Sequence, residues 1–150
     1  MSCPFSFSQL ETHFPAEDRT LFFKNMGWDS FINNANYKNT CAMRVSVCLA
    51  RLGVSMPQGQ FKILKGPQGG QRVDIKWQSL TQFLTGIWGA PSIINTGNLS
   101  TYKGIIVFEQ LPPDDQGNSY PGHIDVLNGP AGVCLYRSYF GSQKMSVWPV

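Results

Sequence analysis

The sequence predicts a single α+β domain over residues 1–150, with N-terminal helices packed on an antiparallel β-sheet. A chain of 150 residues is long enough to bury roughly two-thirds of its unfolded surface in one core. Apolar residues recur at helical spacing in its first half, and short β-rich runs separated by turn residues follow. Helices followed by strands are typical of an α+β domain.

The first forty residues are expected to be helical, and several of their side chains are available for a core: Phe14, Leu21, Phe22, Phe23 and Phe31. The clearest helix follows. Asn39 and Thr40 supply capping side chains at its start, and Gly53 ends it. Between these signals, apolar residues recur at helical spacing: Ala42, Val45, Leu49 and Leu52.

A loop rich in Gly, Pro and Gln is expected at residues 56–71, and three cations lie in or beside it: Lys62, Lys65 and Arg72. A second clear helix is expected at residues 77–87. Its side chains that should face the core are Leu80, Phe83 and Leu84.

The second half of the chain is expected to form the sheet, because β-rich runs alternate there with turn residues. In chain order we expect a buried strand at 104–108, a polar loop at 111–121, a strand at 123–127, a turn at 128–132, a hairpin partner at 133–139 and a last short strand at 145–148.

The composition excludes several classes of function. The net charge of +3 is too small and too scattered for a nucleic-acid partner, which needs Lys and Arg clustered on one face. No segment approaches the ~18 apolar residues that span a bilayer, so membrane insertion is not expected. The N-terminus lacks a basic region followed by an apolar stretch, so we expect a protein made in the cytoplasm without a signal peptide.

The cysteines form no CxxC pair and no Cys/His spacing suited to zinc: they are Cys3, Cys41, Cys48 and Cys134. Only His13 and His123 accompany them, so we expect no metal site and no other cofactor. A disulfide, for instance between Cys3 and Cys134, stays open for a protein that works outside the cytoplasm.

Cys41 is a candidate nucleophile because it opens the clearest helix. Unpaired backbone N–H groups and the positive end of the helix dipole favour an anion there, which makes a thiolate available at neutral pH. The backbone N–H of Cys41 is itself a candidate donor to an oxyanion. A single Cys in a helix is more often a small buried hydrophobe, as we expect for Cys48. Composition and spacing leave both interpretations of Cys41 open.

A thiolate that cleaves an amide needs a partner that protonates the leaving amine, and imidazole is best matched to neutral pH. His123 follows Gly122 at the start of an expected strand, where a side chain reaches the rim of the sheet. His13 is expected at the surface instead. We therefore expect Cys41 and His123 to meet in a cleft open to solvent, the arrangement of papain-like cysteine hydrolases.

Four stretches of the sequence resemble, in the same order, the type VI secretion amidase effectors of family 4. The nucleophile motif of that family reads Asn-x-Cys-x-x-Arg-x-Ser-x-x-Leu, and residues 39–49 match it. The other stretches are residues 77–91, which hold the expected helix and a Gly-x-Pro ending, residues 103–107, and residues 122–129 with the Gly-His pair. Together they extend over residues 39–129.

The resemblance implies a papain-like fold and hydrolysis of the γ-D-glutamyl–meso-diaminopimelate bond in peptidoglycan stem peptides. It implies that Cys41 is the nucleophile and His123 the general base, with Arg44 and Ser46 in structural roles. It also implies delivery through the type VI secretion tube, by contact with a tube component, into the periplasm of target bacteria. A cognate immunity protein is expected to plug the active site and protect the producer.

The sequence departs from the family at the third catalytic position. The family carries an Asp about eleven residues after the His, where this chain has Cys134, and the family's nearby Cys pair is absent. Asp125 lies on the same face of the expected strand as His123, so it is our first candidate to orient the imidazole. Asn128 is an alternative, and a Cys–His dyad without a third side chain is also open.

Two other functions stay compatible with these residues. The departure at the third position favours a catalytically inactive binding homologue of the same fold. A cysteine acyltransferase would use the same dyad and pass the acyl group to an amine instead of water. The cations Lys62, Lys65 and Arg72 are expected to be solvated, or else to flank the groove and bind stem-peptide carboxylates.

Overall fold

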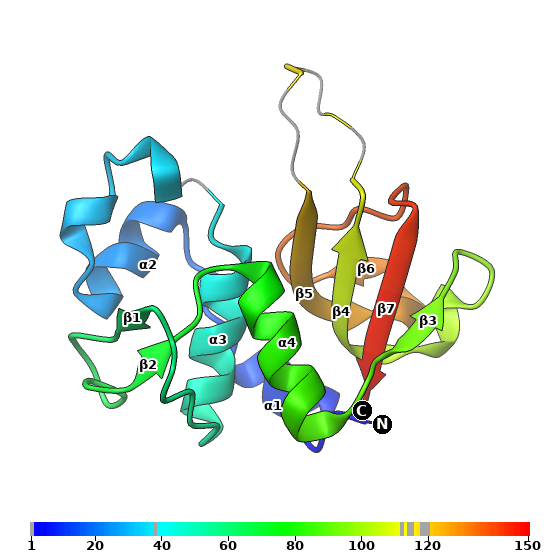
Figure 1. Ribbon diagram of the computed structural model, residues 1–150, viewed down its shortest axis with the longest axis horizontal. Helices are drawn as coiled ribbons and strands as arrows, with labels where there is room; N and C mark the ends of the chain where they lie inside the picture. The colour runs from blue at the N-terminus through cyan, green and yellow to red at the C-terminus, as the bar shows by residue number, and fades with distance from the viewer. Residues whose placement is uncertain (1, 38, 112, 114–115, 118–120) are drawn as a thin grey trace.

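The structure, a computed structural model, describes residues 2–37, 39–111, 113, 116–117 and 121–150, and it confirms the α+β class (Figure 1). Within these residues the α-helices are α1 (Phe7–His13), α2 (Arg19–Met26), α3 (Cys41–Arg51) and α4 (Trp77–Trp88). Short 3-10 helices lie at Asp29–Phe31, Ala35–Tyr37, Leu99–Thr101 and Gly129–Ala131.

The main sheet has five antiparallel strands in the order β3-β7-β4-β5-β6. Their bounds are β3 (Ser92–Ile94), β4 (Lys103–Glu109), β5 (Gly122–Asn128), β6 (Val133–Cys134) and β7 (Lys144–Pro149). Two further strands, β1 (Phe61–Lys62) and β2 (Arg72–Val73), form a small antiparallel sheet on the other side of α3 (Figure 1).

Helix α3 lies between the main sheet and the small sheet, and residues 41–50 of this helix are all buried (Figure 1). One face packs on β5, and the other packs on α2 and the small sheet. The first face is formed by Ala42, Val45, Cys48 and Leu49, and the second by Met43, Val47 and Ala50. A helix with apolar side chains on two faces is buried when both faces find a partner. This enclosure holds the first residue of α3, Cys41, in a defined position.

The two ends of the chain meet beside the main sheet. Cys3 N–H donates to the Pro149 carbonyl (2.8 Å), and Val150 N–H donates to the Lys103 carbonyl (2.9 Å). Lys103 begins β4 opposite the end of β5, whereas His123 lies at the start of β5. The termini are therefore at the opposite end of the sheet from His123 (Figure 1).

The predicted helices at 77–87 and after Asn39, and the strands at 104–108, 123–127 and 145–148, are confirmed to within a residue or two. The prediction that Leu21 joins the core is wrong, since its side chain is 47% exposed. The register of α2 turns other side chains inward instead: Phe22, Phe23 and Met26.

Two predictions about irregular segments need correction. The expected loop at 56–71 contains β1, whose two residues are too few to show a periodic pattern. The expected strand at 133–139 ends at Cys134, because the backbone that follows turns to donate hydrogen bonds to a buried side chain of β5. Strand β3 was not predicted, and the expected loop at 111–121 lies partly outside the described residues.

No helix in the described ranges of the chain has both the length and the apolar character needed to cross a membrane.

Candidate active site

Cys41 is the first residue of α3, and the side chain of a preceding residue holds its backbone. Asn39 Oδ1 accepts a hydrogen bond from the Cys41 N–H (3.1 Å). Thr40, at the N-cap, makes no side-chain capping bond, and its Oγ1 instead accepts from Arg44 Nε (2.8 Å). The prediction that both side chains cap the start of the helix is therefore right for Asn39, which accepts from a backbone N–H group, and wrong for Thr40.

Arg44 anchors the start of α3 from inside the molecule, in the structural role expected for it. Its side chain is 1% exposed, and its Nη1 donates to the carbonyls of Pro15 (2.8 Å) and Glu17 (2.6 Å). Burial lowers the Arg44 pKa, and the nearby Tyr136 and Glu17 oppose that shift. Ser46 also bonds to backbone, since its hydroxyl donates to the Asp74 carbonyl after β2 (3.0 Å).

The structure brings Cys41, His123 and Asp125 together. The imidazole of His123, on β5, lies close enough to the Cys41 side chain for their interaction to contribute to the raised His123 pKa. Nε2 of the same ring lies 2.8 Å from Oδ2 of Asp125. Because Nε2 faces the carboxylate, Nδ1 is the ring nitrogen left for the thiol. The contacts therefore run in the order thiol, imidazole, carboxylate.

The carboxylate of Asp125 is completely buried and is held by several backbone donors. Oδ1 accepts from the N–H groups of Val126 (2.7 Å) and Tyr136 (3.2 Å), and Oδ2 accepts from the Arg137 N–H (2.8 Å). These bonds occupy both oxygens and hold the carboxylate in place. Tyr136 and Arg137 lie just after β6, close to the position at which the family carries its Asp. Here that segment supplies N–H groups to a carboxylate that comes from β5.

The environment of His123 keeps its imidazole protonated. Burial by itself would lower the His123 pKa, but hydrogen bonds and charge interactions with Asp125 and Cys41 outweigh burial and raise the pKa to about 9. The ring therefore carries a positive charge at neutral pH.

The thiol and the imidazole do not lie in the open cleft that we expected from the sequence. Cys41 is 3% exposed and His123 is 2% exposed. Aromatic rings surround the imidazole, with centroids at 4.8 Å (Tyr139), 5.8 Å (Phe108) and 6.3 Å (Tyr136). The expectation was wrong because the segment after β6 folds back over the ring, a long-range contact that local patterns do not encode.

The alternative third partners have other roles in the structure. Asn128 Oδ1 accepts from the Ala131 N–H (3.4 Å) and so stabilises the turn after β5. Cys134 lies on β6, where burial raises the pKa of its thiol and its N–H donates to Ser138 Oγ (3.0 Å). In the described part of the chain, neither residue is hydrogen-bonded to His123.

All four cysteines are free thiols, so the structure contains no disulfide between Cys3 and Cys134. Cys48 is fully buried in α3, its Sγ donates to the Leu10 carbonyl (3.4 Å), and burial raises its pKa to about 12. Cys48 is thus the structural residue that the sequence predicted. Among the described residues, no group of three or more His, Cys, Asp or Glu is arranged to hold a metal ion.

Comparison with known protein families identifies the chain. The family described as "Type VI secretion system (T6SS), amidase effector protein 4", abbreviated Tae4, matches residues 37–148. The chain belongs to this family. No curated protein matches the sequence.

Solved Tae4 structures share the fold of this family member. Tae4 from Enterobacter cloacae has 20% identity, a TM-score of 0.77 and coverage of 100% of this chain and 99% of that chain. The Tae4–Tai4 effector–immunity complex from Salmonella Typhimurium has 19% identity, a TM-score of 0.75 and coverage of 97% of each chain. The corresponding Enterobacter cloacae complex has 19% identity, a TM-score of 0.71 and coverage of 96% and 94%. At this level of identity the comparison establishes a common fold.

Our sequence analysis of this Tae4 family member missed the contact between Trp77 and Gly122. A Cβ atom on Gly122 would lie 2.1 Å from Cε2 and 2.3 Å from Cζ2 of the Trp77 indole. The indole packs against the apolar cluster that contains Cys41, and its Nε1 is buried without a hydrogen-bond partner in the described structure. Gly122 is therefore needed beside His123 because the indole occupies the space of a side chain. The Gly-His pair was the only sequence signal, and it does not identify Trp77.

Replacing Gly122 with alanine should displace the Trp77 indole and disturb the residue next to His123. We expect the free energy of unfolding to fall by about 1–3 kcal/mol, the usual cost of overpacking a core, together with a loss of amidase activity. Denaturant unfolding measures the first effect. Gly86→Ala is the matched control, because a Cβ at Gly86 in α4 meets nothing within 4 Å. A Gly122→Ala protein as stable and as active as the parent would contradict this reading of the contact.

Proposed function

We propose that the chain is a peptidoglycan amidase, a DL-endopeptidase of papain-like fold that cleaves the γ-D-glutamyl–meso-diaminopimelate bond of stem peptides. The observation that carries the proposal is the contact order from the Cys41 thiol through the His123 imidazole to the Asp125 carboxylate. Membership of the amidase effector family supports the reaction class. In this proposal Cys41 is the nucleophile, His123 the acid and base, and Asp125 the group that orients the ring.

The first half of the reaction forms an acyl-enzyme. Because both reacting groups are buried, substrate must first displace part of the aromatic cover around His123. The Cys41 thiolate then attacks the carbonyl carbon of the γ-D-glutamyl group, and the carbonyl π electrons move to oxygen. When the tetrahedral intermediate collapses, the C–N bond breaks and His123 gives its proton to the departing amine of diaminopimelate.

The second half releases the acyl group to water. Neutral His123 takes a proton from a water molecule, whose oxygen attacks the thioester carbonyl. Collapse of this second intermediate expels the Cys41 thiolate, leaves a γ-carboxyl group on the glutamate and returns His123 to its protonated form. Throughout the cycle Asp125 keeps Nε2 protonated and Nδ1 directed at the reacting atoms.

The oxyanion is stabilised by the first turn of α3. An α-helix provides no acceptor for the N–H groups of Ala42 and Met43, so these groups and the helix dipole favour negative charge next to Cys41. The Cys41 N–H, which the sequence suggested as a donor, is bound to Asn39 Oδ1 (3.1 Å) in this structure. It becomes available to the oxyanion only when the Asn39 side chain releases it.

Membership of the family supports a proposal for the biological setting. We propose that the protein is an antibacterial toxin that a type VI secretion apparatus carries into the periplasm of target bacteria, with a tube component as its carrier. Solved relatives are effector–immunity complexes of Tae4 with Tai4, which supports a cognate immunity protein as the partner of this chain as well.

Mass spectrometry of muropeptides tests the proposed activity. Digestion of purified sacculi should yield disaccharides that carry only L-alanyl-D-glutamate, together with peptides that begin with diaminopimelate. Products cut at another bond would contradict the specificity, and unchanged sacculi would contradict the activity. Digestion with an added primary amine separates hydrolysis from acyl transfer, because a transferase product carries the mass of that amine. The contact between Asp125 and the imidazole favours an active enzyme over the inactive-homologue alternative.

A further inference from the structure

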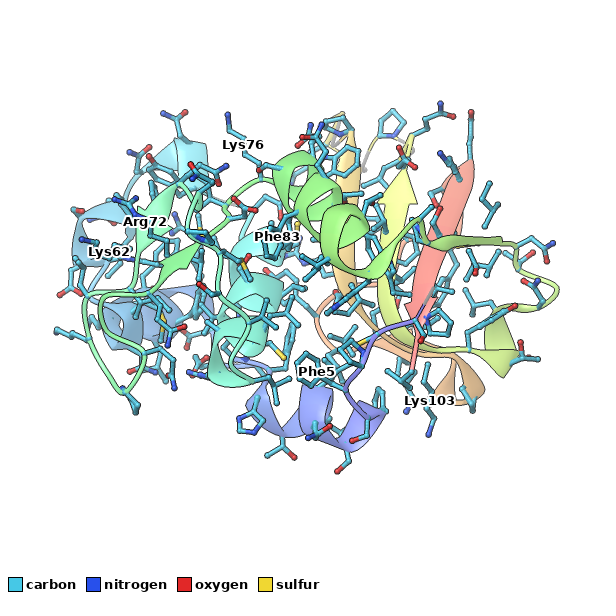
Figure 2. All side chains as sticks on the ribbon, turned by 60° about the horizontal axis from the view of Figure 1, so that its bottom comes forward. Phe5, Lys62, Arg72, Lys76, Phe83 and Lys103 are labelled. Atoms are coloured by element: carbon cyan, nitrogen blue, oxygen red, sulfur yellow. The ribbon has the colours of Figure 1, made fainter. Side chains whose placement is uncertain are left out.

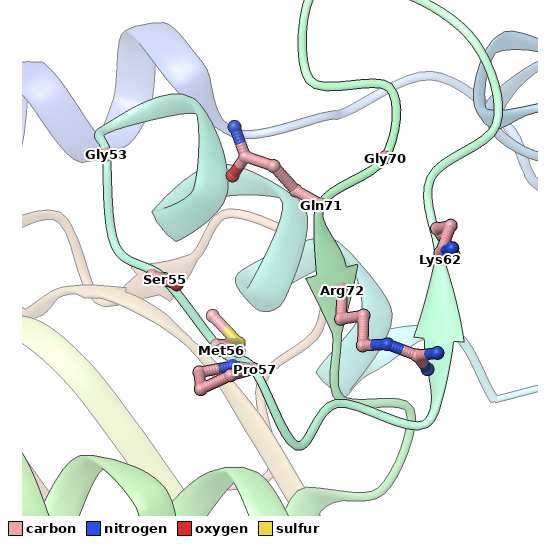
Figure 3. Close-up of a pocket in the computed structure, with 8 residues that line it drawn as sticks. All are labelled: Gly53, Ser55, Met56, Pro57, Lys62, Gly70, Gln71 and Arg72. Carbon is pink, nitrogen blue, oxygen red and sulfur yellow. The ribbon is translucent and has the colours of Figure 1, made fainter.

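A pocket of about 540 Å³ lies at the end of α3 that is remote from Cys41 (Figure 3). It is bordered by the segment that follows α3 and by the β1–β2 hairpin, and the residues that define it include Ser55, Met56, Lys62, Gly70, Gln71 and Arg72. Cys41 begins this helix of 11 residues, whereas Gly53 and Ser55 of the pocket wall follow its end. At a rise of 1.5 Å per residue, the backbone at the end of α3 lies about 16 Å from the backbone of Cys41.

Two cations of this pocket are held as direct neighbours. Lys62 of β1 and Arg72 of β2 are cross-strand partners in the small sheet. Figure 2 shows them together on this side of the molecule, far from Lys103 at the other end. Like charges directly opposite each other on a sheet repel, so this pairing destabilises the hairpin unless an anion lies between them. The pair is therefore a candidate site for an anion.

No carboxylate compensates the two charges from within the described residues. None of the residues that border the pocket is acidic, and the ion pairs of the described chain join other groups. Asp74, two residues after Arg72, is buried and borders a different pocket. The Arg72 guanidinium is held by the Gly59 carbonyl, which accepts from its Nη1 (3.3 Å). Its remaining N–H groups can bind an oxyanion, and a planar guanidinium matches a carboxylate well.

The shape of the surface indicates a ligand longer than a small ion. A second pocket of about 370 Å³ shares Met56 and Pro57 with the first and extends to Ser79 and Phe83 on α4. A chain that places an acidic group between Lys62 and Arg72 can therefore continue across Met56 towards α4. A peptide that carries a free carboxylate has both features, an acidic group and an extended chain.

We propose that Lys62 and Arg72 bind a carboxylate of an extended peptide, and that the pocket is a second site, remote from Cys41, that anchors the protein on the carboxylate-rich peptides of the cell wall. The inference rests on the proposed function for the identity of its ligand. In this proposal Lys62 and Arg72 are neither solvated loop charges nor groups beside the catalytic groove, the two alternatives that the sequence left open. Lys65, the third cation of the segment, does not border the pocket.

A pelleting assay with insoluble sacculi tests the site. All proteins carry Cys41→Ala so that the sacculi stay intact, and the variant adds Lys62→Gln and Arg72→Gln, which remove charge but keep side-chain length. We expect the apparent Kd for sacculi to rise about tenfold, the effect of losing two exposed ionic contacts. The matched control is Lys24→Gln with Lys65→Gln, which removes the same charge from outside the pocket and should leave the Kd unchanged. Equal weakening by both pairs, or by neither, would overturn the proposal.

Two further measurements define the ligand and separate this proposal from the catalytic one. Sacculi whose carboxylates have been converted to amides with carbodiimide should bind the parent as weakly as native sacculi bind the Lys62→Gln/Arg72→Gln variant. Equal binding of the parent to amidated and native sacculi would rule out a carboxylate. With Cys41 restored, the double variant should cleave a soluble disaccharide-tetrapeptide at the parental kcat/KM. A fall in kcat/KM as large as the loss of binding to sacculi would mean that the pocket serves the catalytic groove. If no protein, the parent included, cleaved the substrate, the result would count against the proposed function alone.

Discussion

Replacing Cys41 with alanine should lower kcat for muropeptide hydrolysis by at least about a thousandfold, because no other group at the start of α3 can form the acyl-enzyme. The fold should persist, since the change removes one sulfur atom from a helix that is packed on all sides. Release of soluble muropeptides from sacculi measures the rate, and denaturant unfolding measures the stability.

The matched control for this substitution is Cys48→Ala, in the same helix. Cys48 is fully buried and its Sγ bonds to the Leu10 carbonyl, so its replacement should cost about 1 kcal/mol of stability and leave kcat near the parental value. The proposed mechanism would be wrong if Cys41→Ala digested sacculi as fast as the parent. It would also be wrong if the two alanine variants lost activity equally.

Replacing Asp125 with asparagine should lower kcat roughly a hundredfold, because the imidazole loses the group that orients it and stabilises its charge. Asparagine also places an NH₂ group where Oδ2 now accepts from the Arg137 N–H, so two donors would face each other in a buried site. We expect the free energy of unfolding to fall by about 2–4 kcal/mol. Asp29→Asn, an exposed carboxylate away from the site, is the control and should change neither quantity.

The pH dependence of stability distinguishes the charge of Asp125 from its packing. In the folded protein the His123 pKa is raised from 6.5 to about 9, so the protonated form stabilises the native state. This contribution is complete below about pH 6.5, is lost as the pH rises to about 9, and amounts to roughly 3 kcal/mol. In Asp125→Asn the His123 pKa should fall, so less stability should be lost between these pH values. A slope equal to that of the parent would show that Asp125 does not hold the imidazole proton.

The sequence predicted the two elements that carry the reacting groups. Asn39, the apolar spacing after it and Gly53 identified the helix that Cys41 begins, and a β-rich run after Gly122 identified the strand of His123. These signals are local, since capping and periodicity involve residues within a few positions of each other. The family motif added a prediction of the reaction class. The catalytic roles of the individual residues stay predictions.

Long-range contacts decided what the sequence left open. Asp125, Asn128 and a dyad were all compatible with the strand, and the choice depends on the N–H groups of Tyr136 and Arg137, which fold back onto the Asp125 carboxylate. The same fold-back buries His123 and makes the expected open cleft wrong.

The sequence alone determined the α+β class of this protein and its principal helices and strands. It also determined which elements present a thiol and an imidazole, because periodicity and capping act over a few neighbouring residues. The tertiary structure decided which carboxylate meets the imidazole, why Gly122 must lack a side chain beside Trp77, and how Lys62 and Arg72 border one pocket. Each of these depends on backbone or side chains that lie far apart in the chain, and their approach is set by the packing of the whole domain.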